Sequence, residues 1–137
     1  MVIWISVALV YALVPLIMIG AGWMMYKHPP KAINGIIGYR TTRSSVNQQT
    51  WDFAQNYAGR LWIRWGIWML LGSMAAFLLV SLWGQEMAGI MGTVFCLLQC
   101  AVMVASIYFV EKALKENFDK FGNRREHNGE KNGSSQL

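Results

Sequence analysis

The sequence predicts an all-α membrane protein with three transmembrane helices and a cytoplasmic amphipathic segment between helices one and two. Three stretches of the chain, residues 1–26, 65–85 and 87–110, contain no Asp, Glu, Lys or Arg. Charged residues make up 14 % of the chain, against about 25 % in soluble domains. At 137 residues the chain allows one domain. This composition excludes a disordered chain, a disulfide-rich secreted fold and a typical soluble enzyme.

The first apolar stretch, residues 1–26, exceeds the roughly 20 residues that a bilayer core requires. It lacks the basic start and the small-residue cleavage site of a signal peptide, and Lys27 follows it, so we expect a retained helix. Pro15 has no N–H to donate to the carbonyl of Tyr11. A kink is therefore predicted near the middle of this helix, where neighbouring helices can tolerate it.

The second and third stretches are separated only by Gly84, Gln85 and Glu86, so an antiparallel helical hairpin is predicted. Gln99 is the one strongly polar side chain deep in the third span, and we expect it to face the bundle interior. Cys96 and Cys100 are expected to be packing residues, because i,i+4 side chains on a helix have poor disulfide geometry. The spacing of two small residues in the second span is compatible with hairpin packing or with a homo-oligomer: Gly72 and Ala76.

The charges predict the orientation of the chain. With three spans, residues 27–64 and the residues after 110 share one side of the membrane, and all 12 Lys and Arg residues lie there. The positive-inside rule then places the N-terminus outside and the C-terminus in the cytoplasm of a cell-membrane protein. After residue 110, six basic residues are balanced by five acidic ones, so no direct nucleic-acid binding is expected.

The segment from Pro29 to Gly59 is more informative than the spans. Pro29 and Pro30 should end the first helix. Ser45 and Gln48 fit a capping box, which predicts a helix start there. Four residues spaced four, three and four apart should share one face of that helix, which could run directly into the second span: Asn47, Trp51, Ala54 and Ala58. We expect this face to pack on the bundle or a partner, with Asn47 bonded to the Asn34–Thr41 turn.

Taken singly, these residues have ordinary explanations. An interfacial Arg commonly contacts lipid phosphate or marks topology, and a Trp near a membrane commonly anchors at the interface. Their order, however, resembles the motif of the SdpI family of bacterial membrane proteins over residues 27–60. That motif is an Asn, then Gly-aromatic-Arg-Thr, then Ser, Asn, Trp and a small residue. The matching positions are Pro30, Asn34, Gly38, Tyr39, Arg40, Thr41, Ser44, Asn47, Trp51 and Ala54.

The resemblance implies immunity to a membrane-active toxic peptide, sensing of that peptide, or both. The alternative is a membrane regulator that recruits a cytosolic transcriptional repressor or another protein. An enzyme is not expected, and neither a cofactor nor a metal is. The expected partners are the lipid bilayer, a toxic peptide and a cytosolic repressor. The ligand- or partner-binding residues are expected to be Asn34, Gly38, Tyr39, Arg40, Thr41, Ser44, Asn47 and Trp51.

Two regions are expected along the chain. Residues 1–117 form the three-helix transmembrane domain, and residues 118–137 form a polar, disordered cytoplasmic tail. Gly122 and Asn123 are a helix stop signal, and Asn128–Gln136 is almost wholly polar.

Overall fold

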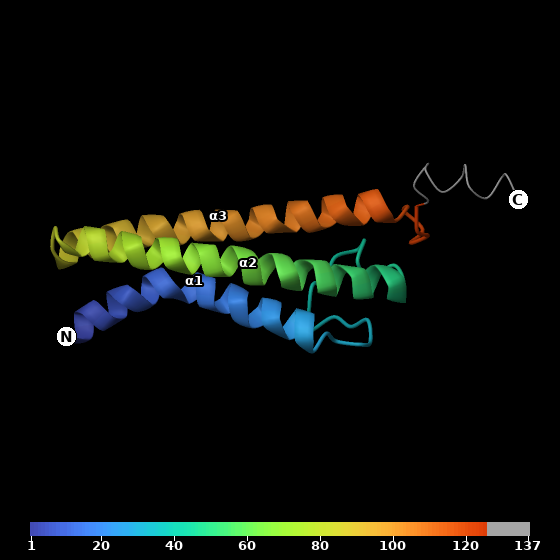
Figure 1. Ribbon diagram of the computed structural model, residues 1–137, viewed down its shortest axis with the longest axis horizontal. Helices are drawn as coiled ribbons and strands as arrows, with labels where there is room; N and C mark the ends of the chain where they lie inside the picture. The colour runs from blue at the N-terminus through green and yellow to red at the C-terminus, as the bar shows by residue number, and fades with distance from the viewer. Residues whose placement is uncertain (126–137) are drawn as a thin grey trace, which may run out of the picture.

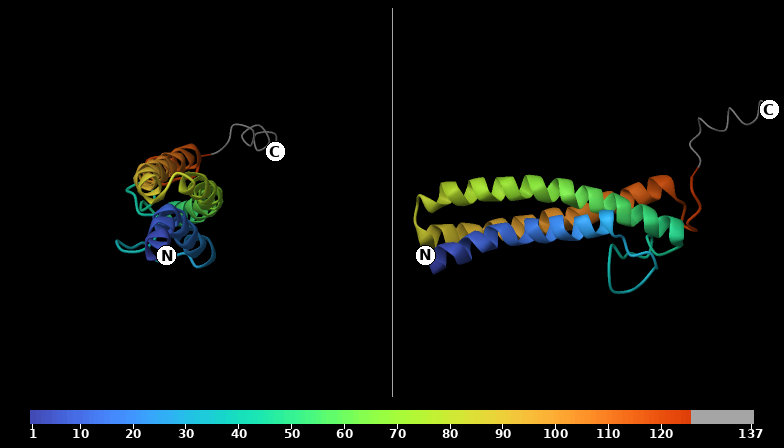
Figure 2. Two further views of the ribbon diagram at one scale, coloured as in Figure 1. Left: turned by 90° about the vertical axis from the view of Figure 1, so that its left-hand side faces the viewer. Right: turned by 60° about the horizontal axis from the view of Figure 1, so that its bottom comes forward.

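The computed structural model describes residues 1–125 and contains three helices: α1 (Val2–Lys27), α2 (Gln48–Ser81) and α3 (Gln85–Asn117). Each is long and apolar enough to cross a membrane. Viewed along the bundle, the helices form a triangle, as the left view of Figure 2 shows. The predicted all-α membrane fold with three spans is confirmed. We call the end that carries residues 28–47 and 118–125 the loop end, and the opposite end, which carries residues 82–84, the hairpin end.

The first helix is continuous through Pro15 and bends near its middle (Figure 1). The carbonyl of Tyr11, which Pro15 cannot serve, accepts a hydrogen bond of 3.2 Å from the side-chain amide of Gln99 on α3. Gln99 is 2 % exposed and also donates to the hydroxyl of Ser73 on α2. The expected position of Gln99 inside the bundle is therefore confirmed, and its amide joins all three helices.

The second helix starts later than the predicted capping box of Ser45 and Gln48 suggested. Its N-cap is Asn47, and its capping box pairs Asn47 with Thr50 instead of Ser45 with Gln48. The amide N–H of Thr50 donates to the Asn47 side chain at 2.9 Å, and the N–H of Asn47 donates to the Thr50 hydroxyl at 3.1 Å. From this cap the helix runs without a break through the motif and into the second span, as expected.

The hairpin turn comes slightly before the residues predicted for it. α2 ends at Ser81, Leu82–Gly84 turn the chain, and Gln85 already belongs to α3. Gly84 has a φ of 103°, a backbone conformation that favours glycine. The N-terminus lies at this same end of the bundle (Figure 1), so α1 runs antiparallel to α2 along its length.

Glycines allow α1 and α2 to approach closely. A Cβ atom built on Gly22 would lie 2.8 Å from the carbonyl oxygen of Gly59, and one built on Gly59 would lie 2.8 Å from the carbonyl oxygen of Gly22. A side chain at either position would push the helices apart. Gly72, in contrast, meets no atom within 4 Å, so it makes no close helix–helix contact inside this chain.

A compact core lies at the loop end and determines the position of residues 28–47, the segment between α1 and α2, which we call the motif segment. Its buried residues come from all three helices, from the segment between α1 and α2 and from the residue after α3: Met25, Tyr39, Ala54, Ala58, Val110, Leu114 and Phe118. The shared face predicted for Trp51, Ala54 and Ala58 is confirmed, because all three are completely buried. The motif segment is thus attached to the bundle by packing as well as by hydrogen bonds.

The chain after α3 folds back in a turn. Phe118 is 3 % exposed and packs edge-on against Phe53 of α2. The carboxylate of Asp119 accepts hydrogen bonds from the N–H groups of Phe121 and Asn123, both at 2.9 Å. Residues 118–125, assigned above to the polar tail, lie in a turn that contacts the bundle. The disorder expected for residues 126–137 concerns a stretch outside the described residues.

Candidate functional site

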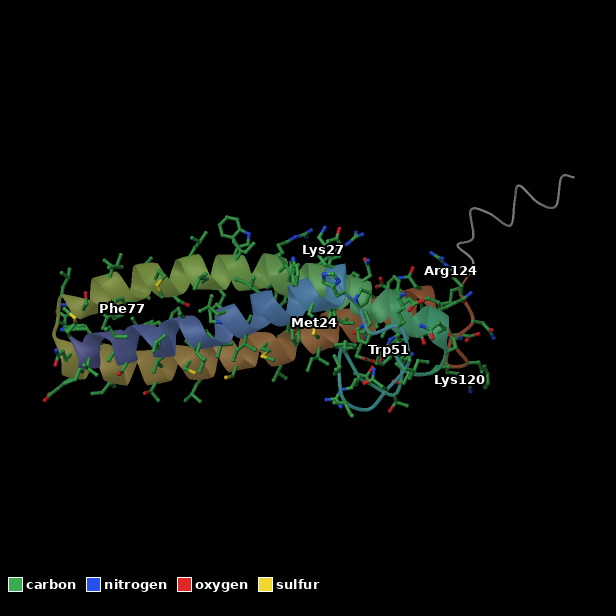
Figure 3. All side chains as sticks on the ribbon, turned by 90° about the horizontal axis from the view of Figure 1, so that it is seen from below. Met24, Lys27, Trp51, Phe77, Lys120 and Arg124 are labelled. Carbon is green, nitrogen blue, oxygen red and sulfur yellow. The ribbon has the colours of Figure 1, made fainter. Side chains whose placement is uncertain are left out.

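The motif segment begins where the chain leaves α1 at the loop end. Pro30 follows the end of α1, and its carbonyl accepts a hydrogen bond of 2.6 Å from the indole N–H of Trp51. Trp51 is completely buried. Its indole ties the start of the segment to α2. Figure 3 shows Trp51 among the side chains of the loop end. The side chain of Gln48 adds a second tie, donating to the carbonyl of Lys31 at 2.6 Å.

Asn34 organises the turn that follows. Its side-chain oxygen accepts hydrogen bonds from the N–H groups of Ile36 at 2.9 Å and Ile37 at 2.7 Å. Its amide donates to the carbonyl of Ala32 at 2.9 Å. This is the backbone-mimicking role typical of Asn in turns. Both polar groups of the Asn34 side chain are thus hydrogen-bonded to the backbone of the segment itself.

Gly38 and Tyr39 dock the segment on α2 through Gln55. The side-chain oxygen of Gln55 accepts from the N–H of Tyr39 at 2.8 Å, and its amide donates to the carbonyl of Tyr39 at 2.7 Å. Gly38 has a φ of 97°, and a Cβ there would lie 2.6 Å from the Gln55 oxygen. Both conformation and space therefore require glycine at this position. Gln55 is completely buried, and the sequence analysis did not single it out.

The phenol of Tyr39 connects the segment to α3. It donates a hydrogen bond of 2.8 Å to the carboxylate of Glu111. Burial, together with the hydrogen bond and the charge of Glu111, raises the pKa of Tyr39 well above its ordinary value of 10.0, so the phenol stays protonated and remains a donor. The other oxygen of Glu111 lies 3.6 Å from Nε of Arg43, which completes a chain of three side chains.

Thr41 and Ser44 close a tight reciprocal turn. The N–H of Thr41 donates to the hydroxyl oxygen of Ser44 at 2.8 Å, and the N–H of Ser44 donates to the hydroxyl oxygen of Thr41 at 3.1 Å. Ser44 is completely buried. These two motif residues therefore fix the backbone between Tyr39 and the start of α2.

Asn47 bonds to a different partner from the one expected. Its amide donates a hydrogen bond of 2.8 Å to the carbonyl of Gly122, in the turn after α3, and not to the Asn34–Thr41 turn. Gly122 has a φ of 80°, and a Cβ there would collide with the Asn47 amide. The need for a partner was inferred correctly, but the partner is 75 residues away. Asn47 therefore ties the motif segment to the C-terminal turn.

Arg40 is the exposed member of the motif. One terminal nitrogen of its guanidinium donates to the carbonyl of Gly35. Because a guanidinium has five N–H donors, this bond leaves others on the exposed Arg40 side chain. Of the eight residues expected to bind a ligand, the structure places Arg40 at the surface, while the buried ones, such as Tyr39, Ser44 and Trp51, support the backbone.

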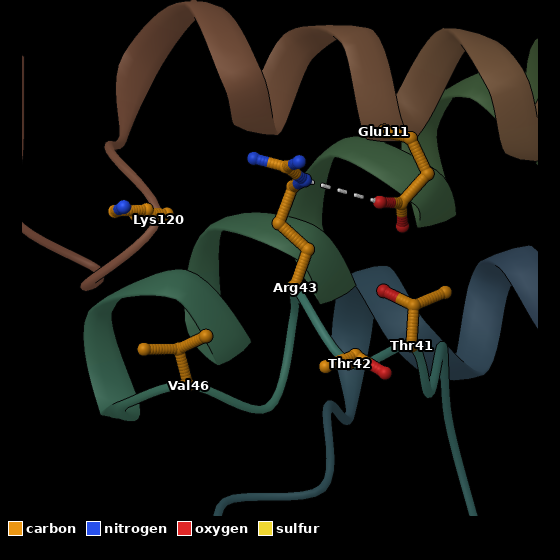
Figure 4. A pocket seen from close by; sticks show the side chains of 6 residues that line it. All are labelled: Thr41, Thr42, Arg43, Val46, Glu111 and Lys120. Atoms are coloured by element: carbon orange, nitrogen blue, oxygen red, sulfur yellow. Dashed lines mark ion pairs between the residues drawn. The ribbon is translucent and has the colours of Figure 1, made fainter.

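A cleft of about 440 Å³ opens beside this motif segment. Figure 4 shows it, with contributions from the motif segment, from α3 and from the turn after α3. Thr41 is the only expected site residue among those that line it. The lining residues are Thr41, Thr42, Arg43, Val46, Glu111 and Lys120. The sequence offered one signal for Glu111, since it is the first charged residue after the third span.

The cysteines of α3 lie elsewhere. Cys96 is half-buried, Cys100 is exposed, and both are free thiols. Within residues 1–125, no three His, Cys, Asp or Glu side chains come together in a way that could hold a metal ion.

Comparisons with known proteins agree with the motif. The SdpI/YfhL protein family model matches residues 31–110, which is more than half of the chain. The chain is also 42 % identical over 62 residues to the uncharacterized protein YfhL of Bacillus subtilis (strain 168). That alignment covers 42 % of this chain and 56 % of YfhL, so the match spans little more than half of the relative. No solved structure matches the chain significantly. The matched residues include the whole segment from Asn34 to Trp51, and the chain belongs to the SdpI/YfhL family.

Proposed function

We propose that this protein confers immunity to a membrane-active toxic peptide, senses that peptide, or does both, as its resemblance to the SdpI family implies. The observation that supports the proposal is the motif segment itself. Hydrogen bonds that it donates to Gln55, Glu111 and the carbonyl of Gly122 attach it to α2, α3 and the turn after α3. Immunity of this kind needs a binding surface and no chemical step.

The outer face of the segment suits an amphipathic peptide. Ile36 and Ile37 are 82 % and 50 % exposed, and the Arg40 guanidinium lies near them, bonded to Gly35. Apolar side chains next to a planar cation offer contacts for both the apolar and the anionic groups of such a peptide. The positive-inside rule places this face on the cytoplasmic side. The proposed binding of the peptide therefore takes place at the inner leaflet.

The second candidate is recruitment of a cytosolic repressor or another protein. It is favoured by the position of the 31–37 turn, which projects from the side of the bundle at the loop end, as the right view of Figure 2 shows. Exposed isoleucines on a projecting turn are typical of protein contacts as well as of membrane contacts. The two candidates differ in whether survival under peptide challenge depends on a soluble partner.

A protection assay tests the proposal. The full chain is expressed in a bacterial host that lacks its own relatives of the family, and cells are challenged with purified membrane-active peptides. Survival and membrane potential are recorded. We expect the chain to raise the lethal dose of at least one peptide. Gly38→Ala should lose this effect, because the new Cβ collides with Gln55.

The matched control is Gly72→Ala, which adds the same methyl group in open space. It should protect like the unmodified chain when both variants reach the membrane at equal levels. Protection by none of the peptides, or equal protection by both glycine variants, would contradict the proposal. Protection that disappears only when a cytosolic partner is deleted would favour the second candidate.

A further inference from the structure

The cleft at the loop end brings two cations and two hydroxyl groups together. Arg43 lines the cleft from the motif segment, and Lys120 lines it from the turn after α3. The ammonium of Lys120 lies over the Phe121 ring, 5.2 Å from its centroid. The hydroxyl-bearing side chains of Thr41 and Thr42 line the same space. In Figure 4, Arg43 lies between Glu111 on one side and Lys120 on the other. A planar guanidinium, an ammonium and hydroxyl donors are the groups that bind phosphate oxygens in proteins.

Glu111 is the acidic residue of the cleft lining and is paired with Arg43. Its carboxylate accepts from the Tyr39 phenol at 2.8 Å and pairs with Nε of Arg43 at 3.6 Å. The ion pair of Arg43 is made through Nε, and within residues 1–125 its two terminal nitrogens donate no hydrogen bond. With two cations and one carboxylate, the cleft lining has a net charge of +1.

The motif positions both cations. Tyr39 holds the carboxylate that orients Arg43. Asn47 holds the carbonyl of Gly122, two residues after Lys120, and thereby fixes the turn that carries the ammonium. Tyr39 and Asn47 were expected to touch a ligand directly. They do not line the cleft, but they support the two cationic residues that do.

The depth of the cleft matches the headgroup region of a bilayer. Glu111 directly follows the uncharged stretch 87–110, which is long enough to cross the hydrocarbon core. The cleft therefore begins where the apolar span ends. At this level the anionic groups in reach are the phosphates of lipid headgroups and free phosphate from the adjoining water.

We propose that the cleft between the motif segment, α3 and the turn after α3 is a binding site for a phosphate group, held by Arg43, Lys120 and the hydroxyls of Thr41 and Thr42. The site is independent of the proposed immunity function, because phosphate binding can be measured without any peptide. It would fix the loop end of the bundle to the headgroup layer.

The test uses the full chain in neutral detergent micelles. Native mass spectrometry counts the molecules of phosphatidylglycerol or phosphatidylcholine that stay bound during a titration, and thermal unfolding is recorded with inorganic phosphate. We expect retention of phosphatidylglycerol over phosphatidylcholine. Combined Arg43→Gln and Lys120→Gln should weaken retention about tenfold or more, the factor expected for losing a charge-assisted contact.

The matched control combines Lys112→Gln with Lys115→Gln, which removes two exposed cations from the same end of α3 outside the cleft. It should leave the retention unchanged. Lys120→Gln alone is the second variant, since it leaves the Arg43–Glu111 pair intact and so tests the site even if loss of Arg43 disturbs the fold. It should weaken retention in the same direction.

The arms of the experiment separate the two sources of phosphate. If inorganic phosphate neither stabilises the chain nor displaces phosphatidylglycerol, the ligand is the lipid headgroup. If it does both, the cleft recognises the phosphate group by itself, and either result supports the site. No preference for phosphatidylglycerol together with no effect of phosphate would overturn it. Equal losses of phosphatidylglycerol retention in the cleft and control variants would also overturn it. So would displacement of phosphatidylglycerol by polyglutamate that is stronger than displacement by inorganic phosphate.

Discussion

The phenol of Tyr39 donates a hydrogen bond to the carboxylate of Glu111, 72 residues further along the chain. Tyr39 lies in the middle of the family motif, and Glu111 lies just beyond the third span. The bond therefore attaches the motif segment to α3, the one described helix that is not adjacent to the segment in sequence. The same carboxylate pairs with Arg43. One side chain of α3 therefore contacts both the buried Tyr39 and the cleft-lining Arg43 of the segment.

Tyr39→Phe removes this bond and keeps the ring in the core. A hydrogen bond to a charged group contributes about 1.5–3 kcal/mol, and we expect a loss of stability in that range. The free energy of unfolding is measured by detergent denaturation of the purified chain.

Tyr108→Phe is the control for this change. Tyr108 is on the same helix as Glu111 and is 66 % exposed, so loss of its hydroxyl should have little effect. Equal losses for the two variants would show that the Tyr39–Glu111 bond contributes nothing specific.

Arg40→Lys tests the exposed motif residue. The guanidinium of Arg40 can bond to the Gly35 carbonyl and keep further donors for a ligand, whereas a lysine ammonium cannot reproduce this planar arrangement. We expect the protective dose to fall about tenfold at unchanged protein level. Arg64→Lys, in an exposed position on α2, should behave like the unmodified chain. Full protection by Arg40→Lys would show that Arg40 contributes only its positive charge to the orientation of the chain in the membrane.

Much of the fold could be predicted from the sequence, because each span is a long local pattern. Three uncharged stretches were enough to find three helices, and residue spacing was enough to find the buried face of Trp51, Ala54 and Ala58. The lost hydrogen bond at Pro15 and the buried position of Gln99 were also predicted separately. What the sequence did not show is that Gln99 donates to the Tyr11 carbonyl that Pro15 leaves free.

The site was less predictable because its partners are distant in the sequence. Ser45 with Gln48 and Asn47 with Thr50 both place polar side chains three residues apart, so local chemistry does not decide between the two helix starts. The carbonyl of Gly122 favours Asn47 as the cap, and no local pattern contains that contact. Gln55 and Glu111 were missed for the same reason, since their roles depend on which backbone and side-chain groups the fold brings to them.

Pro15 and Gln99 should be energetically coupled. Gln99→Met removes the donor to the Tyr11 carbonyl and also removes the buried Gln99 oxygen, which has no hydrogen-bond partner within residues 1–125. Pro15→Ala restores the helical N–H that this carbonyl lacks. Gln99→Met should therefore cost about 1 kcal/mol less in the Pro15→Ala background than in the original one. Unfolding of the four chains in a double-mutant cycle measures this difference, and strict additivity would contradict it.

The charge distribution predicts the topology. A reporter fused after Leu137 should be active only in the cytoplasm, and one inserted at Gln85, beside the hairpin turn, should be active only outside. All 12 Lys and Arg residues lie on the first of these sides in a three-span chain. The opposite reporter pattern would remove the argument for a cytoplasmic motif segment.

The central claim is that the motif segment is a fixed structure attached to α2, α3 and the C-terminal turn. Amide hydrogen exchange of the full chain in lipid nanodiscs tests it most directly. The N–H groups of Tyr39, Thr41 and Asn47 donate to side chains at 2.8, 2.8 and 3.1 Å and should exchange slowly. Residues 31–33, whose N–H groups make no hydrogen bond within the described chain, should exchange fast. Uniformly fast exchange from residue 31 to 47 would contradict the account.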